Sequence, residues 1–220
     1  MSDLQPSFCA MKNINYTLKL LLFSAVLLSA AASAETLTAV QIYSQDELLN
    51  LIGKNKHLQR VKADDCQLVE DIKARSEKMK VPAYQFLYGD MLLYGVCVDK
   101  NVNLGMDFIH QSANQGLPDA LEQLGRYYNE GRFVRKDKNR ATEYFYAASS
   151  VGHLRAQMQL IELYNAGYGA PHDYYYAYHW LHNAIIEQGK DQQKAEQLLA
   201  QLSKKMPETV VTQAKQPLER

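Results

Sequence analysis

Residues 118–152, PDALEQLGRYYNEGRFVRKDKNRATEYFYAASSVG, have the pattern of two helices joined by a short loop. Pro118 suits a first helical turn, where its missing N–H costs nothing. Gly131 suits the end of that helix, because glycine tolerates left-handed backbone geometry. Asp137 can cap the second helix through its carboxylate, and Gly152 closes it. Apolar residues recur at helical spacing in both halves: Ala120, Leu121, Leu124 and Tyr128, then Ala141, Tyr144, Phe145, Ala148 and Val151.

The same pattern recurs every 36 positions through the second half of the chain. Matching positions are Gly95, Gly131 and Gly167; Val98, Val134 and Ala170; Asn101, Asp137 and Asp173; Gly105, Ala141 and Ala177; Phe108, Tyr144 and Trp180; and Ser112, Ala148 and Ala184. A fixed period in this range indicates stacked supersecondary units. We therefore predict an all-α fold, a right-handed α-solenoid of helix pairs. Such a fold is mainly a surface for holding other proteins.

This layout resembles the Sel1-like repeat family, which is related to the tetratricopeptide repeats. The family pattern runs A-x-x-x-L-G-x-x-Y, then a G-x-G-V-x-x-D loop, then spaced alanines and an aromatic residue. The second unit matches it most fully, whereas the third has Ile161 in place of the expected glycine. The predicted repeats cover about 81–117, 118–153 and 154–190.

The segments outside the repeats have their own patterns. Residues 1–34 are predicted to be a signal peptide with an Ala32-Ser33-Ala34 cleavage site, and 1–10 reflect an overlong start. A retained anchor is the alternative, but the apolar run is shorter than the roughly 20 residues that span a membrane. Residues 35–80 form a predicted N-terminal adaptor. Residues 191–206 form a capping helix, and 207–220 form a disordered tail.

Within the adaptor, residues 36–43 are β-prone and are expected to be extended. Ser44 and Glu47 form a capping-box pair ahead of an apolar run, which predicts a helix. A second helix is predicted from residue 64 to about residue 79. An extended segment can add a strand to the sheet edge of a partner protein, so we take Val40, Ile42 and Tyr43 as candidate partner contacts.

The predicted exported chain keeps two cysteines, Cys66 and Cys97. In an oxidising compartment such a pair commonly forms a disulfide. The bridge would tie the adaptor to the first interhelical loop, and closing a loop of about 30 residues is worth about 3–4 kcal/mol. The alternative is one buried thiol and one partly exposed thiol.

Catalytic chemistry is not indicated. The chain has 24 acidic and 24 basic residues and no basic cluster interleaved with aromatics, which argues against a nucleic-acid partner. It has no recognisable nucleophile motif and no glycine loop for phosphate, so we predict no catalytic residue and no cofactor. A catalytic triad assembled from residues far apart in the sequence is an alternative that the sequence leaves open. His179 and His182 could share one helix face, but zinc needs a third ligand. We expect these histidines at the surface or in a groove, and no metal site.

The most suggestive surface feature is the aromatic content, with fifteen tyrosines. Exposed tyrosines suit protein interfaces, since they give large contact area with few rotors to freeze. Residues 174–176 are consecutive tyrosines, and a helix spreads such residues around its axis, so they cannot all point inward. We therefore predict a partner-binding patch in the third unit. Its residues are Tyr168, Tyr174, Tyr175, Tyr176 and Tyr178. The alternative is that the chain's own tail covers this face.

Over residues 36–206 the chain as a whole also resembles the ring-forming structural proteins of the polar flagellar motor. The resemblance rests on the signal, the segments 39–53 and 81–90, Cys66 and the three repeats. It implies a periplasmic location in the flagellar basal body. It also implies MotY as a partner, contact with the periplasmic region of a PomB-like stator B subunit, and self-association in a ring. Such a ring recruits and holds stator units, which are typically sodium-driven.

Two other functions remain open. One is a generic secreted Sel1-like binding scaffold or envelope regulator. The other is a β-lactamase-like secreted Sel1 protein. Proteins of that second kind carry a cysteine pair in each repeat, whereas only Cys66 and Cys97 remain here.

Overall fold

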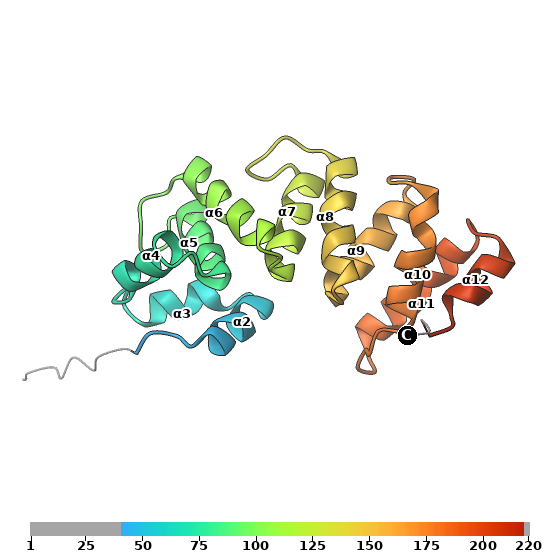
Figure 1. Cartoon of the computed structure of the whole chain (residues 1–220), viewed down its shortest axis with the longest axis horizontal. Coiled ribbons are helices and arrows are strands. Elements are labelled where there is room, and N and C mark those ends of the chain that lie inside the picture. Colours follow the sequence, from blue (N-terminus) through green and yellow to red (C-terminus); the bar gives the residue numbers. More distant parts are fainter. Residues whose placement is uncertain (1–40, 218–220) are drawn as a thin grey trace, which may run out of the picture. The chain divides into compact units, whose positions relative to one another are not determined.

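The computed structural model describes residues 41–217, and the predicted signal peptide lies outside this range. Every helix and strand assignment in this range is helical, which confirms the all-helical prediction (Figure 1). The elements are α2 (Gln45–Gly53), α3 (His57–Ala63), α4 (Val69–Glu77), α5 (Pro82–Tyr94), α6 (Val102–Asn114), α7 (Pro118–Glu130), α8 (Lys138–Ser150), α9 (Leu154–Asn165), the short 3-10 helix η1 (Pro171–Asp173), α10 (Tyr174–His182), α11 (Lys190–Ser203) and α12 (Glu208–Ala214). Among residues 41–217, no helix is both long and apolar enough to cross a membrane.

The helices between α5 and α10 form three consecutive pairs. α5 packs against α6, α7 against α8, and α9 against α10. Each pair also packs against the next, through α6 with α7 and through α8 with α9 (Figure 1). The 36-residue period therefore corresponds to one helix pair, and the pairs stack in chain order.

The local signals in the loops explain where these helices begin and end. Gly95 and Gly131 end α5 and α7 with φ values of 66° and 77°, in the left-handed region. Asn101 and Asp137 cap α6 and α8, since their side-chain oxygens accept backbone N–H bonds of 3.1 Å and 3.0 Å. The third unit departs from this scheme. Asp173 makes no side-chain cap, and η1 precedes α10 instead.

Glycine allows the paired helices to approach closely. A Cβ on Gly89 would lie 2.9 Å from the Cδ1 of Ile109 and 3.0 Å from the carbonyl oxygen of Gly105. A Cβ on Gly125 would lie 2.5 Å from the Cδ1 of Phe145. These glycines lie inside helices, where glycine costs about 1 kcal/mol relative to alanine. Close packing of α5 on α6, and of α7 on α8, is the physical reason for their presence.

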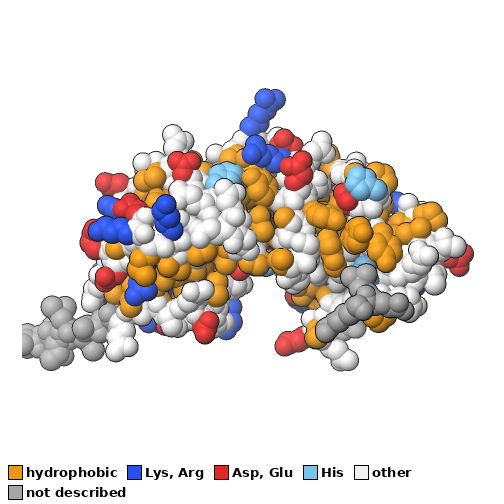
Figure 2. Space-filling model, viewed as in Figure 1, with side chains coloured by type: hydrophobic (Ala, Val, Ile, Leu, Met, Phe, Trp, Pro, Cys, Tyr) orange, Lys and Arg blue, Asp and Glu red, His pale blue; other side chains and the backbone are white. Residues whose placement is uncertain are grey.

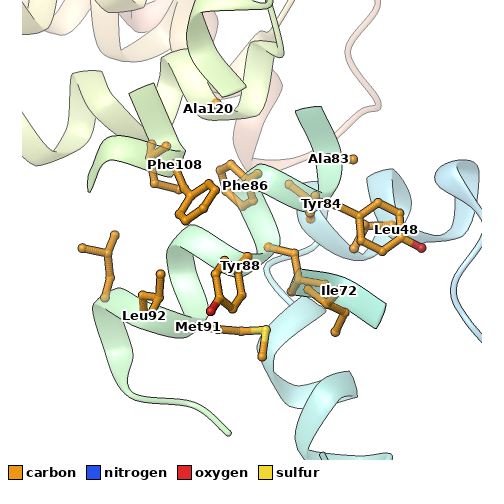
Figure 3. Packing of buried hydrophobic residues seen from close by; sticks show 14 of the residues in the cluster. Leu48, Ile72, Ala83, Tyr84, Phe86, Tyr88, Met91, Leu92, Phe108 and Ala120 are labelled. Atoms are coloured by element: carbon orange, nitrogen blue, oxygen red, sulfur yellow. The ribbon is translucent and has the colours of Figure 1, made fainter. Parts of the chain in front are cut away.

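Before the repeats, α2, α3 and α4 pack on α5. Leu48 of α2 and Ile72 of α4 are fully buried, together with Met91 of α5 (Figure 3). The helix predicted from about residue 64 to residue 79 is present as α4, but it begins only at Val69. Residues 64–68 form a turn after α3, because Asp65 and Cys66 adopt left-handed backbone with φ values of 50° and 60°.

The turn between α3 and α4 is held by a disulfide between Cys66 and Cys97, as predicted, with a Cα–Cα distance of 5.5 Å. Cys97 lies in the loop between α5 and α6 and has a φ of 60°. One and two periods later, Phe133 and Gly169 occupy the same register with φ values of 62° and 78°. The position that Gly169 occupies in the third unit is therefore Cys97 in the first unit, where it forms the crosslink to the N-terminal helices.

A buried polar network also joins the N-terminal helices to the first two repeats. The Nε2 atom of His57 in α3 lies 2.8 Å from the Oδ2 atom of Asp90 in α5. Gln123 of α7 donates to the Oδ1 atom of Asp90 at 2.6 Å and to the hydroxyl of Tyr127 at 2.7 Å. The Tyr127 hydroxyl lies 3.2 Å from that of Tyr94. Burial, and secondarily the charge of Asp90, raises the pKa of Tyr127 well above its ordinary value.

At the other end, α11 packs on α9 and α10 and buries Leu198, Leu199 and Leu202. The prediction of a disordered tail from residue 207 was wrong, because α12 follows and packs on α10. α11 ends at Ser203, and Pro207 is the residue directly before the first turn of α12, where a proline is well tolerated. Val211 and Ala214 lie at i and i+3 and bury one face of α12.

Candidate functional site

Helix α10 carries most of the tyrosines that the sequence analysis placed at a partner-binding surface, and it buries two of them. Tyr174 and Tyr178 are 7% and 5% exposed, so their placement at the surface was wrong. With Ala177 and Leu181 they lie at i, i+3, i+4 and i+7, which is the inward stripe of a helix. The ring of Tyr174 also packs 4.9 Å from that of Tyr164 in α9.

The outward face of α10 presents a ladder of aromatic rings. Trp180 lies 5.0 Å from Tyr146 of α8 and 6.0 Å from Tyr176, and Tyr175 lies 5.2 Å from Tyr176. Tyr176 is 45% exposed, and the other three are half-buried. We call Tyr146, Tyr175, Tyr176 and Trp180 the aromatic surface. Figure 2 shows hydrophobic side chains gathered over the region of α9 and α10.

Tyr146 and Trp180 were missing from the predicted patch. Trp180 occupies the aromatic position of the repeat, which favoured a purely structural interpretation. Tyr146 lies on α8, in the preceding unit, and reaches α10 only through the stacking of helix pairs. Tyr168, the remaining predicted residue, is half-buried in the loop after α9, with the Nζ atom of Lys138 lying 4.5 Å from its ring centroid.

A groove of about 450 Å³ borders the aromatic surface between α8, α9 and α10. Trp180 and Ile185 line it, and Ile185 is fully exposed. Two buried polar atoms of its lining residues, the Oγ of Ser149 and the Oε1 of Gln157, have no hydrogen-bond partner among residues 41–217. These atoms are closed off from solvent, so the accessible lining of the groove is defined by its apolar rim. An apolar rim beside partly exposed aromatic rings suits a protein segment.

The two histidines of α10 do not act together. His179 is buried, and its Nδ1 atom lies 3.0 Å from the carbonyl oxygen of Ala214. It lines the groove, which is one of the two places expected for it. The docking of α12 covers it. His182 is exposed, and its pKa is lowered by partial burial first and then by the charge of Lys215. Within residues 41–217, no three His, Cys, Asp or Glu side chains lie together as a metal site would require.

The second predicted contact region, at the N-terminal end, is only partly described. Val40 lies outside the described residues, and Ile42 is half-buried. Tyr43 is 2% exposed, so its prediction as a surface contact was wrong. Its hydroxyl donates to the Oδ2 of Asp64 at 2.7 Å, and its carbonyl accepts a bond from the Tyr84 hydroxyl. Burial, followed by the hydrogen bond to Asp64, raises the pKa of Tyr43. Tyr43 anchors the chain at the start of the described region.

Comparison with known proteins agrees with this architecture. The Sel1 repeat family matches residues 82–117, 118–153 and 155–188. The sodium-type polar flagellar protein MotX of Vibrio parahaemolyticus is 48% identical over 196 residues, which are 89% of this chain and 92% of that protein. The crystal structure of a Sel1 repeat protein from Oxalobacter formigenes superposes with a TM-score of 0.52 and 26% identity. That superposition covers 60% of this chain and 96% of the other.

Proposed function

The chain belongs to the family of the polar flagellar protein MotX, a family with Sel1 repeats, and from that premise we propose that it is a periplasmic structural protein of the polar flagellar motor. In this role it forms a ring around the basal body together with MotY. The ring recruits and holds stator units, which are typically sodium-driven. The chain itself conducts no ions and catalyses no reaction.

Similarity outside the repeats supports this proposal most strongly. The Sel1 match begins at residue 82 and ends at residue 188, whereas the similarity to the Vibrio protein extends over 196 residues. A generic Sel1 scaffold would share the repeat pattern alone. Similarity that includes α2 to α4 indicates that the two proteins have the N-terminal helices in common as well as the repeats. The disulfide and the buried network join these helices to the repeats.

We propose that the protein is exported to the periplasm. The signal pattern in residues 1–34 and the disulfide between Cys66 and Cys97 both suit an oxidising compartment. The bridge covers a sequence separation of 31 residues and stabilises the junction between the N-terminal helices and the first repeat.

We assign contact with MotY to the segment before the first described helix. Tyr43 belongs to the core, so we assign the contact with MotY to residues 36–42, including Val40 and Ile42. An extended segment of this kind can add to the edge of a partner's sheet. The test is a deletion of residues 36–42, which keeps Tyr43 and α2 and should abolish MotY binding; unchanged binding would contradict the assignment. A longer deletion to residue 53 would remove buried Leu48 and Ile52 and test folding instead.

We assign contact with the periplasmic region of the stator B subunit to the aromatic surface and the adjoining groove. Trp180 lies at their common border, because it belongs to the ring ladder and also lines the groove. Large aromatic side chains that are partly exposed beside a groove are typical of the residues that dominate interface energies.

A chromosomal deletion tests the proposed function. Cells without the gene are expected to build normal polar filaments, visible by electron microscopy, yet to stop swimming. A plasmid copy with its own signal peptide restores swimming, whereas a copy without residues 12–34 does not. Normal swimming by the deletion strain would contradict a role of this protein in the flagellar motor.

A further inference from the structure

The third helix pair is shorter than the other two, and the groove beside Trp180 lies at its incomplete end. α6 and α8 each have 13 residues, whereas α10 has 9 and ends at His182. In the register of the repeat, residues 183–186 correspond to the last helical turns of α6 and α8, at 111–114 and 147–150. In the third pair these residues follow the helix as a loop, and Asn183, Ala184 and Ile185 line the groove.

Direct contacts close the same end of the first pair. The hydroxyl of Ser112 donates to the carbonyl oxygen of Pro82 at 2.8 Å, and the Nε2 atom of Gln85 donates to the Oε1 atom of Gln111 at 3.0 Å. Two periods later the same four positions all line the groove, and they are Leu154, Gln157, Asn183 and Ala184. The groove is therefore the space between two helices that the last helical turn closes in the first pair.

Burial in this turn shows what the opening exposes. Two of its positions are at most 5% exposed in both earlier pairs, where they are Ser112, Ala113, Ala148 and Ser149. In the third unit these positions are Ala184, which is half-buried, and Ile185, which is fully exposed. Apolar surface in water is unfavourable, so a form of the chain that covers Ile185 gains stability from its burial.

The loop after α10 also has the residues needed for one more helical turn. Residues 115–117 join α6 to α7, and residues 151–153 join α8 to α9. The loop from α10 to α11 is longer and covers residues 183–189. A helix α10 that ended at Ile186 would leave 187–189, a connection as long as the two others, so α11 could keep its place. Residues 183–186 contain neither glycine nor proline, so their sequence permits a helical turn.

We propose that residues 183–186, the closing turn, exchange between the open form described above and a helical form that extends α10 by one turn. In the helical form Ala184 and Ile185 take the positions that Ala148 and Ser149 have in the second pair, and they close the groove against the start of α9. The groove of about 450 Å³ provides the room that isoleucine needs beyond serine.

The closing turn and a partner segment would exclude each other from the groove, so a partner that binds the groove favours the open form. That this exclusion controls the contact with the stator rests on the proposed function. The exchange itself is a property of the isolated protein and is tested separately.

Two variants should fix the two forms. Asn183→Ala combined with Ile185→Ser and Ile186→Ser gives the closing turn the Ala-Ala-Ser-Ser sequence of residues 147–150, and this triple variant should be helical there. Ile185→Pro should stay open, because a proline in a helix removes a backbone hydrogen bond and clashes with the carbonyl four residues earlier. In the open form the N–H of Ile185 makes no backbone hydrogen bond within residues 41–217, so this proline removes none. Ile185→Ala is the matched control and keeps both forms.

NMR of the full-length mature protein measures the exchange. The wild type should populate the helical form at about 1–10%, on the microsecond to millisecond timescale. Relaxation dispersion should then report one process shared by the amides of residues 184–186 and the indole of Trp180, which is the only tryptophan and lines the groove. Ile185→Ala should retain this process, and Ile185→Pro should give flat profiles. The triple variant should show helical Cα shifts across residues 183–186. Flat profiles in the wild type, or non-helical shifts in a folded triple variant, would overturn the proposal.

Swimming separates the exchange from its role in the motor. If the stator binds the open groove, cells with the triple variant should swim more slowly than wild type, whereas cells with Ile185→Pro should swim like those with Ile185→Ala. Wild-type swimming by a triple variant whose closing turn is helical would overturn the control of the stator contact, while the NMR result for the exchange would stand.

Discussion

The Nε2 atom of His57 lies 2.8 Å from the Oδ2 atom of Asp90, and both side chains are at most 5% exposed. This contact joins α3, which precedes the repeats, to the first helix of the repeats. Within the described part of the chain, the Nδ1 atom of His57 has no hydrogen-bond partner, so the imidazole depends on Asp90 for its polar contact. The position of the N-terminal helices on the solenoid is thus fixed by a polar contact as well as by apolar packing.

Loss of the Asp90 carboxylate should destabilise the protein strongly. Asp90→Ala leaves His57 and Gln123 buried without their partner, and we expect the free energy of unfolding in urea to fall by about 3 kcal/mol. Asp99→Ala, in the exposed loop after α5, is the control and should change it by less than about 0.5 kcal/mol. Similar urea midpoints for the two variants would show that the network contributes little.

The disulfide should account for a comparable share of stability. Cys97→Ser opens a crosslink with a sequence separation of 31 residues, and we expect a loss of about 3–4 kcal/mol in the free energy of unfolding. Reduction of the wild-type protein should lower its melting temperature to that of the variant. The double variant with Cys66→Ser should be no less stable than the single one. A reduced wild type that melts like the oxidised form would contradict this role.

Replacing two tyrosines of α10 by alanine should have sharply different effects on the free energy of unfolding. Tyr178→Ala empties a core position and should reduce the free energy of unfolding by about 3 kcal/mol. Tyr176→Ala truncates an exposed ring and should change it by less than about 0.5 kcal/mol, while reducing swimming speed. Swimming at wild-type speed by a Tyr176→Ala, Trp180→Ala double variant would remove the aromatic surface from the proposed stator contact.

The environment of His110 gives a pH-dependent prediction. Its pKa is lowered from the ordinary value of 6.5 by burial and by Arg140. Because the folded state then binds the proton less readily than the unfolded state, this contribution to stability is fully present above about pH 6.5 and is lost as pH falls through the folded pKa. Urea unfolding at several pH values should therefore show a smaller loss on acidification for His110→Gln than for wild type.

Titration of His110 by NMR also locates the guanidinium of Arg140. Arg140→Gln should raise the pKa of His110, since it removes a nearby positive charge, and Asp107→Asn should lower it. An unchanged pKa in the Arg140→Gln variant would place the guanidinium away from the imidazole.

Much of the repeat architecture could be predicted because its determinants are local. A left-handed φ at Gly95 or Gly131, and a cap at Asn101 or Asp137, are properties of a few neighbouring residues. The disulfide was also predictable, because the predicted exported chain holds only Cys66 and Cys97.

The errors concern residues whose burial depends on distant elements. The predicted disordered tail contains α12, which covers His179 and which sequence periodicity over so short a segment did not indicate. Tyr174 and Tyr178 lie on the buried stripe of α10. Their helical spacing is present in the sequence, but the tyrosines between and beside them obscured which residues face inward. The contact of His57 with Asp90 joins residues 33 positions apart and has no sequence signature.

Counting stator units at the cell pole tests whether this chain holds them at the flagellar base. Fluorescently labelled stator B subunits would be imaged in live cells with and without the chain, with filament number as the internal control. We predict that polar stator foci disappear without the chain, while filaments persist, and that the plasmid-borne gene restores the foci. Stator foci of normal intensity in cells that lack the chain would contradict the claim.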